Sequence, residues 1–89
     1  MRRVRMIVCG RVQGVGYRYF VLAQAQEHGI KGYVRNLPGG EVEVDAEGER
    51  NNLANFILGC KKGSRMSDVQ GCFIHDIPYF GFQHFNIKR

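Results

Sequence analysis

The stretch LPGGEVEVDAE, residues 37–47, contains the clearest structural pattern of the chain. It places Pro38 before two glycines, a combination typical of a tight turn because glycine accepts positive φ. After the turn, apolar and acidic side chains alternate strictly. This period of two predicts a strand with one face buried and the other exposed to water. We expect the apolar set, Val42, Val44 and Ala46, to be buried. We expect the acids, Glu41, Glu43, Asp45 and Glu47, to form a solvated strand face and not a carboxylate pair.

The segments before this hairpin predict a strand, a helix and a second strand. Apolar residues alternate over residues 4–8, which indicates a strand ending at Gly10. A helical stripe follows, and Gly29 stands where a glycine would end the helix; the stripe contains Tyr17, Val21, Ala25 and His28. Residues 30–36 are expected to form the second strand.

The segments after the hairpin predict one more helix and two more strands. A stripe with the spacing i, i+3, i+4 and i+7 indicates an amphipathic helix that frays near Gly59 and Gly63; its members are Leu53, Phe56, Ile57 and Cys60. The final strands are expected at residues 69–74 and 82–87, with a turn at Pro78 between them.

The predicted order is therefore β-α-β-β-α-β with a short extra strand. Two helices on one face of a mainly antiparallel sheet form a ferredoxin-like α/β sandwich, an α+β fold. A chain of 89 residues is sufficient for one domain, so we expect residues 1–89 to form a single domain. This fold supports many unrelated functions and does not identify one.

The composition is that of an ordinary globular protein, with 44% hydrophobic and 24% charged residues. No apolar run approaches the roughly 18 residues of a membrane span, and the run after the basic N-terminus is too short for a signal peptide. Cys9, Cys60 and Cys72 lack the spacing of a redox pair or a zinc site, so we expect free thiols. Cys9 stays open as a catalytic thiol because it precedes a glycine-rich segment. We expect a cytoplasmic protein that neither contacts a membrane nor uses a metal.

The net charge of +5 is unevenly distributed. Residues 1–37 carry seven basic residues against one acid, whereas residues 38–58 carry five acids against one arginine. The basic first segment suits an anionic partner, either a phosphate-bearing small molecule or a nucleic acid. Charge alone does not distinguish between these two classes of ligand.

Residues 10–18, GRVQGVGYR, join the first predicted strand to the first predicted helix. Three glycines permit a tight loop whose N–H groups turn inward beside a helix N-terminus, an arrangement that binds anions. Arg18 falls in the first helical turn, from which its guanidinium can bind a phosphate bidentately. No Gly-Lys-Ser/Thr follows, and Tyr19 replaces the third glycine of a dinucleotide fingerprint. The residues alone leave two interpretations open, an anion site and a simple strand-to-helix turn.

A second motif lies downstream, at residues 32–36 (GYVRN) and 40–42 (GEV). Together with residues 10–18, in this order and spacing, it resembles the two signatures of the acylphosphatase family. The first signature is G-x-V-Q-G-V-x-[FY]-R, and the second places an asparagine before a glycine turn and a strand. Tyr33 stands where the family often has Trp. The match is looser from residue 59 to residue 80, including KKGS at residues 61–64, where the family often has a Gly-Pro pair.

The resemblance implies an enzyme that hydrolyses acyl phosphates to a carboxylate and inorganic phosphate, without metal or cofactor. It implies that Arg18 and the loop N–H groups bind the phosphate, and that Asn36 orients the attacking water. The implied phosphate-binding residues are Gln13, Gly14, Val15, Gly16, Tyr17 and Arg18. The carboxylate leaving group is weakly basic, so positioning and charge stabilisation can carry the step without a strong general acid. Inorganic phosphate is then both product and inhibitor, and we expect a monomer.

Two other functions are compatible with parts of the sequence. Residues 31–33 begin like the motif of an RNA-binding module on the same fold, but residues 34–36 replace the aromatic pair that should follow. Nucleic acid is therefore not the expected partner. A phosphate-sensing domain without turnover is the third hypothesis, and the presence of both Arg18 and Asn36 argues against it. Asn36 by itself is also compatible with a simple turn residue at a strand end.

The remaining aromatic and titratable residues are assigned structural roles. We expect core positions and not a base-stacking platform for Tyr17, Tyr19, Phe20, Phe80, Phe82 and Phe85. We expect surface positions for His75, Asp76 and His84, and a position at the helix end for His28, where its charge favours the helix dipole.

Overall fold

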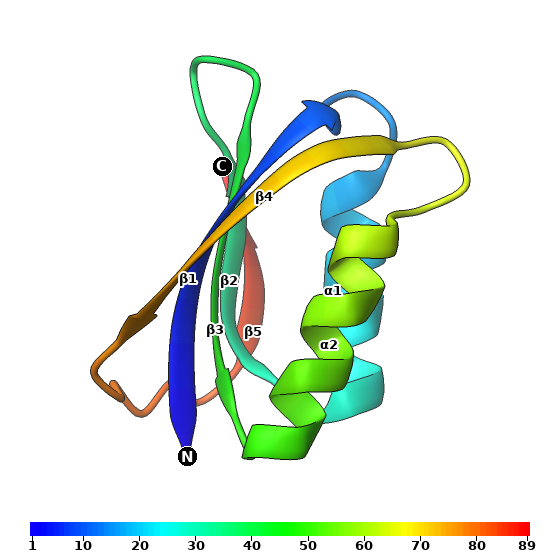
Figure 1. Ribbon diagram of the computed structural model, residues 1–89. Coiled ribbons are helices and arrows are strands. Elements are labelled where there is room, and N and C mark those ends of the chain that lie inside the picture. The colour runs from blue at the N-terminus through cyan, green and yellow to red at the C-terminus, as the bar shows by residue number, and fades with distance from the viewer.

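In the computed structural model, which describes residues 1–89, two helices pack on one face of a five-stranded sheet (Figure 1). The elements are β1 (Arg2–Arg11), α1 (Tyr17–His28), β2 (Lys31–Asn36), β3 (Val42–Gly48), α2 (Arg50–Lys62), β4 (Asp68–Ile77) and β5 (Phe85–Lys88). This order confirms the predicted ferredoxin-like sandwich. β4 is longer than predicted and β5 shorter, because residues 82–84 belong to the turn between them. No helix has the length and apolar character needed to cross a membrane.

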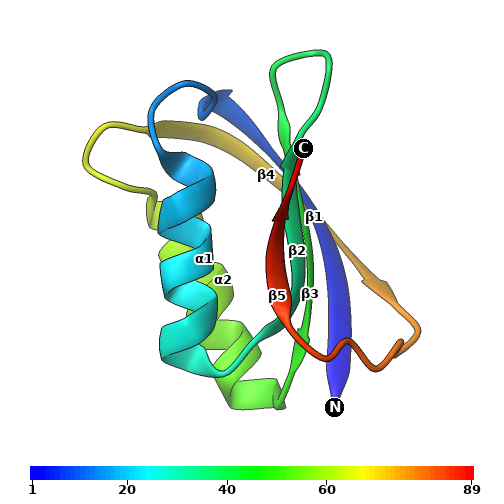
Figure 2. The same ribbon diagram turned by 180° about the vertical axis from the view of Figure 1, so that it is seen from behind.

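The sheet has the strand order β4-β1-β3-β2-β5, so β3 is its central strand. Neighbouring strands are antiparallel except β2 and β5, which are parallel. Figure 2 shows from behind that both helices cover the same face. The β1–α1 loop and the β2–β3 hairpin lie at one end of the sheet, and the turn between β4 and β5 lies at the other (Figures 1 and 2).

The ends of both helices are fixed by local contacts. Gly29 follows α1 with a φ of 66°, and Ile30 donates its N–H to the carbonyl of Ala25, as expected for a glycine stop. The carboxylate of Glu49 caps α2 by accepting the N–H groups of Asn51 and Asn52. Gly59 lies inside α2 and not at a frayed end: a Cβ there would lie 2.2 Å from an oxygen of Gln24 in α1. A side chain at position 59 would therefore have to displace the end of the Gln24 side chain.

The hydrophobic core lies between the helices and the sheet. The inward-facing apolar residues of β1, β2 and β3 are buried there, as predicted for Val42, Val44 and Ala46. The helical stripes contribute Tyr17, Val21, Ala25, Leu53, Phe56 and Cys60. All three cysteines are free thiols, as expected, and only Cys60 is fully buried.

The acidic face of β3 is not solvated, and this prediction is wrong. Glu43, Asp45 and Glu47 are only 2%, 2% and 1% exposed. Glu43 accepts hydrogen bonds from Arg5 of β1 (2.6 Å) and Arg35 of β2 (2.5 Å). These three residues form a row of charges across three adjacent strands. The alternation of the sequence identifies two different faces but does not show that arginines of the neighbouring strands cover the second one.

The other two acids of β3 are covered in a similar way, and Glu41, the fourth acid of the prediction, precedes the strand and is partly buried. Asp45 binds Arg3 of β1 through two hydrogen bonds, 2.8 and 2.7 Å long. Glu47 accepts the backbone N–H groups of the three consecutive residues 80–82, at 3.0, 2.8 and 2.5 Å. The turn between β4 and β5 is thereby fastened over the face of the sheet opposite the helices. A buried carboxylate requires such partners because leaving it unpaired costs several kcal/mol.

The aromatic residues divide into three groups. Tyr17 is buried in the core, and Phe20 and Phe85 pack against it. Phe82 lies on the opposite face, where its ring contacts Tyr33 and the guanidinium of Arg3. The predicted core position is therefore wrong for Phe82, and it is wrong for Tyr19 and Phe80, which are 61% and 67% exposed. The expected surface positions of His75, Asp76 and His84 are confirmed.

Glu43→Gln should lower the free energy of unfolding by about 1–2 kcal/mol at neutral pH. The figure is at the low end for hydrogen bonds to charged groups because both arginines remain partly exposed. Burial opposes ionisation of Glu43, but the bonds from Arg35 and Arg5 outweigh it, so its pKa lies below the usual range. A carboxylate with a lowered pKa stabilises the protein above its unfolded pKa, and this contribution disappears as the pH falls through its folded pKa. The difference between wild type and variant should therefore be full above about pH 5 and shrink below it.

Urea unfolding at a series of pH values measures this difference. Glu27→Gln is the matched control, since the side chain of Glu27 is 68% exposed and its loss should change stability little at any pH. A Glu43→Gln variant as stable as wild type at neutral pH would show that the charge row contributes nothing net to folding.

Candidate active site

The loop that links β1 to α1 leaves a run of backbone N–H groups free. Gly14 and Gly16 have φ angles of 73° and 76°, a left-handed conformation that favours glycine. Gly16 is the N-cap of α1, with no side-chain cap and no acid in the first turn. The N–H groups of residues 14–19 donate to no acceptor within the chain; the first helical bond is from Phe20 to the carbonyl of Gly16. Free N–H groups at a helix N-terminus favour an anion.

Arg18 lies in the first turn of α1, as predicted. Its Nη1 donates to the backbone carbonyl of Lys88 in β5, over 3.4 Å, and no carboxylate pairs with it. The guanidinium is therefore held near the last strand while its charge stays uncompensated. The contact with Lys88 was not predicted, because the two residues are 70 positions apart in the sequence.

Asn36 is the last residue of β2, opposite Val42 of β3. Its side-chain oxygen is buried and has no hydrogen-bond partner in the protein. A buried amide oxygen normally has a partner, because leaving it unsatisfied costs roughly 1–3 kcal/mol. The side-chain oxygen of Asn36 is therefore an unused hydrogen-bond acceptor at the end of β2.

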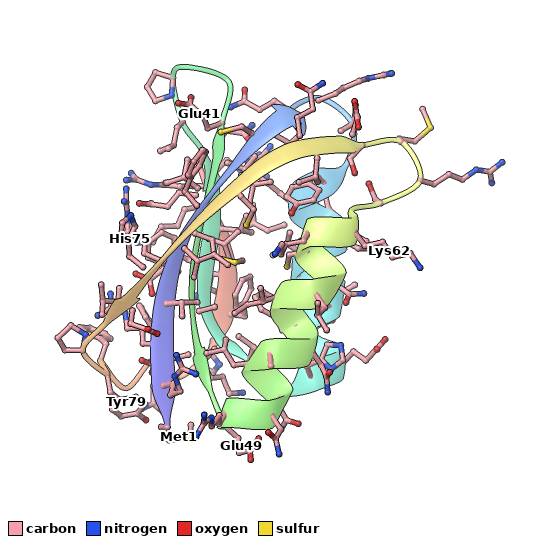
Figure 3. All side chains as sticks on the ribbon, in the orientation of Figure 1. Met1, Glu41, Glu49, Lys62, His75 and Tyr79 are labelled. Atoms are coloured by element: carbon pink, nitrogen blue, oxygen red, sulfur yellow. The ribbon has the colours of Figure 1, made fainter.

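The side chain of Gln13 connects the loop to the end of β2. Its Nε2 donates to the carbonyls of Leu37 and Glu41, both at 2.8 Å. Leu37 directly follows Asn36, so these bonds place the loop beside the strand end that carries Asn36. Figure 3 labels Glu41 in this hairpin, at the opposite end of the sheet from Tyr79. The side-chain amide nitrogen of Gln13 is thus occupied by these two hydrogen bonds. Only the backbone N–H of Gln13 remains available to bind a phosphate.

The other predicted loop residues also have side chains without a polar role in the site. Val15 packs against the core. The hydroxyl of Tyr17 donates to the carbonyl of Cys60 (2.7 Å), and burial raises the pKa of this hydroxyl well above its usual value. Tyr17 therefore remains neutral and joins the start of α1 to the end of α2. Gly14 and Gly16 offer only their backbone, so Arg18 supplies the sole charged side chain of the loop segment 12–18.

No metal cluster adds to this site, and two of the three thiols are unsuited to catalysis. Cys9, which the sequence leaves open as a catalytic thiol, is a partly buried free thiol of β1. Burial raises the pKa of the Cys60 and Cys72 thiols, which disfavours the reactive thiolate. No three His, Cys, Asp or Glu side chains come together in a way that could hold a metal ion. The three cavities, with volumes of about 310, 230 and 130 Å³, lie away from the loop. The site is therefore an open surface of backbone donors and one arginine, which suits a small anion.

Comparison with known proteins identifies the family of this chain. The family model for acylphosphatases matches residues 4–87. The chain is 46% identical over 89 residues to an acylphosphatase of Bacillus licheniformis, covering 99% of both chains, and 45% identical over 83 residues to one of Bacillus pumilus, covering 92% of both. The crystal structure of acylphosphatase from Bacillus subtilis superimposes with a TM-score of 0.96 at 40% identity over the full length of both chains. The chain therefore belongs to the acylphosphatase family, a family of hydrolases.

Proposed function

We propose that this protein hydrolyses the carboxyl-phosphate bond of acyl phosphates, with Arg18 and the loop N–H groups binding the phosphate and Asn36 orienting the attacking water. The observation that carries the proposal is the combination of six N–H groups without an acceptor, at residues 14–19, with an unpaired arginine on the same turn. Family membership supplies the class of reaction. The residue roles rest on the chemistry that follows.

A phosphate on this loop meets donors and positive charge from one side. The N–H groups and the planar guanidinium of Arg18 match the equatorial oxygens of a phosphoryl group, whose negative charge they stabilise. The unsatisfied Oδ1 of Asn36 accepts a hydrogen bond from the attacking water. This bond orients the water so that a lone pair of the water oxygen points to the phosphorus. Water adds its oxygen to phosphorus, the bond from phosphorus to the acyl oxygen breaks, and the carboxylate leaves with the bonding electrons. The water proton passes to the phosphate product or to solvent.

The proposal also includes the domain organisation, the oligomeric state and the cellular location of the enzyme. Residues 1–89 act as one domain and as a monomer, in the cytoplasm, where the three free thiols stay reduced. Nucleic acid is not the proposed partner. Tyr33, on the sheet face opposite the helices, is contacted by the ring of Phe82 and by the ammonium of Lys88, which lies 3.9 Å from the centre of the tyrosine ring. An aromatic covered in this way presents no free stacking surface.

Release of phosphate from a simple aryl acyl phosphate tests the reaction itself. Hydrolysis should proceed equally with and without a metal chelator, because the site residues include no set of metal ligands. Inorganic phosphate should inhibit competitively, because it occupies the same N–H groups and arginine. Loss of activity on chelation, restored by a divalent ion, would overturn the proposed mechanism.

Two variants separate the proposed roles. Arg18→Ala should weaken inhibition by inorganic phosphate and nearly eliminate turnover, because the arginine contacts the phosphate in both ground state and transition state. Asn36→Ala should lower kcat by on the order of 10²-fold, as expected for one positioned hydrogen-bonding group, and leave phosphate inhibition nearly unchanged. Steady-state kinetics with a phosphate titration measures both effects.

Arg18→Lys is the control for charge against geometry, since lysine keeps the charge but not the planar pair of donors. It should retain part of the phosphate affinity and little of the turnover. If Asn36→Ala instead kept its kcat and lost phosphate inhibition, the two roles would have to be exchanged. Circular dichroism confirms that each variant is folded before its kinetics are compared.

A further inference from the structure

We propose that Gln13 is a positioning residue, whose side chain sets the distance between the anion-binding loop and Asn36. The inference rests on the proposed function, because it assigns the loop to the phosphate and Asn36 to the water. It differs from the role expected from the family resemblance, in which Gln13 belongs to the phosphate-binding residues. The side-chain nitrogen of Gln13 donates away from the loop, to two carbonyls of the β2–β3 hairpin.

Both acceptors belong to the residues that close this hairpin. Leu37 donates its N–H to the carbonyl of Glu41 (2.8 Å) and accepts from the N–H of Gly40 (3.2 Å). The Nε2 of Gln13 adds a bond to each of the same two carbonyls, Leu37 and Glu41. It thus joins the two sides of the hairpin at the position directly after Asn36. The rest of the turn, residues 38–40, is exposed, and its proline and two glycines carry no side chain that could form a hydrogen bond to the loop.

On the loop side, Gln13 lies between two anchors. Val12 and Tyr17 are each 1% exposed and fix the two ends of the loop in the core. Between them stand Gly14, Val15 and Gly16, none of which has a polar side chain. Gln13 is therefore the one side chain of this segment that can form a hydrogen bond to the hairpin. No other side-chain bond joins residues 12–16 to residues 36–41.

Loss of this connection should affect the reaction and spare binding. The phosphate is held by backbone N–H groups and Arg18, which remain in place when the side chain of Gln13 changes. The water is held from the other strand, and its approach to phosphorus depends on how the hairpin lies against the loop. A displacement of about 1 Å between reacting groups costs on the order of 10²-fold in rate.

Gln13→Met, which keeps the size but loses the donor, should lower kcat by on the order of 10-fold to 100-fold. Its inhibition constant for inorganic phosphate should stay within about twofold of wild type, because the predicted effect on ground-state binding is nil. Gln83→Met is the matched control: Gln83 is exposed, lies in the turn between β4 and β5 and makes no side-chain hydrogen bond, so its kcat should equal that of wild type. A kcat of Gln13→Met equal to that of the control overturns the proposal. A loss of phosphate affinity with unchanged kcat also overturns it, and returns Gln13 to the phosphate-binding residues.

Gln13→Glu adds a test within one folded protein. Its ionised carboxylate faces two carbonyl oxygens, which repel it, so kcat at neutral pH should fall at least as far as in Gln13→Met. The protonated carboxyl can donate to one of the two carbonyls, so the ratio of variant to wild-type kcat should rise as the pH falls through the pKa of the new carboxyl. A ratio that does not change with pH contradicts a role for the donor.

Amide hydrogen exchange gives a readout that does not depend on activity. The N–H groups of Leu37 and Gly40 should exchange faster in Gln13→Met than in wild type and Gln83→Met, because the hairpin has lost its connection to the loop. Faster exchange together with a wild-type protein that hydrolyses no acyl phosphate would refute the proposed function and leave the structural connection standing. Unchanged exchange would refute the connection even in an active enzyme.

Discussion

The pairing of two buried carboxylates of β3, Glu43 and Asp45, with arginines of the neighbouring strands is the constraint on which the register of the sheet depends. Glu43 binds Arg5 on one side and Arg35 on the other, so one carboxylate fixes three strands relative to each other. Slipping either neighbour by one residue would turn its arginine toward the hydrophobic core and leave Glu43 unpaired. β1 leads into the anion-binding loop and β2 ends at Asn36. The two halves of the candidate site are therefore carried by strands whose register is set by the same charge row.

Much of the fold could be predicted from the sequence, because its signals are local. The apolar stripes at Tyr17 and Leu53 and the strict alternation after Gly40 each need only a few neighbouring residues to be recognised. The burial of the acidic face could not be predicted in this way. Each arginine of β1 looks like an ordinary surface residue, and nothing near Glu47 indicates that residues 80–82 lie over it. Burial of this kind depends on partners that meet only in the folded chain.

The candidate site shows the same division. The loop of residues 10–18 and the asparagine at the end of β2 could be proposed as site residues from their motifs; in the structure Arg18 pairs with no carboxylate and the side-chain oxygen of Asn36 has no partner. The side-chain bonds of Gln13 and the contact of Arg18 with Lys88 could not, because the residues involved are 24, 28 and 70 positions apart. A motif indicates candidate groups for the chemistry, whereas the contacts that position them join residues far apart in the chain.

The position of β1 inside the sheet also determines when this site can exist. Val4 pairs with Ala46 on one side and Asp76 on the other, residues 42 and 72 positions further along the chain. Contacts between such distant residues stabilise the chain only after the entropy of closing long loops has been lost. Folds dominated by such contacts form in milliseconds to seconds instead of microseconds. The helix that carries Arg18 can form early, but by itself it carries no Asn36. Under the proposed function, the candidate site is therefore assembled only when β1 lies between β3 and β4, although both motifs are present in the chain before that.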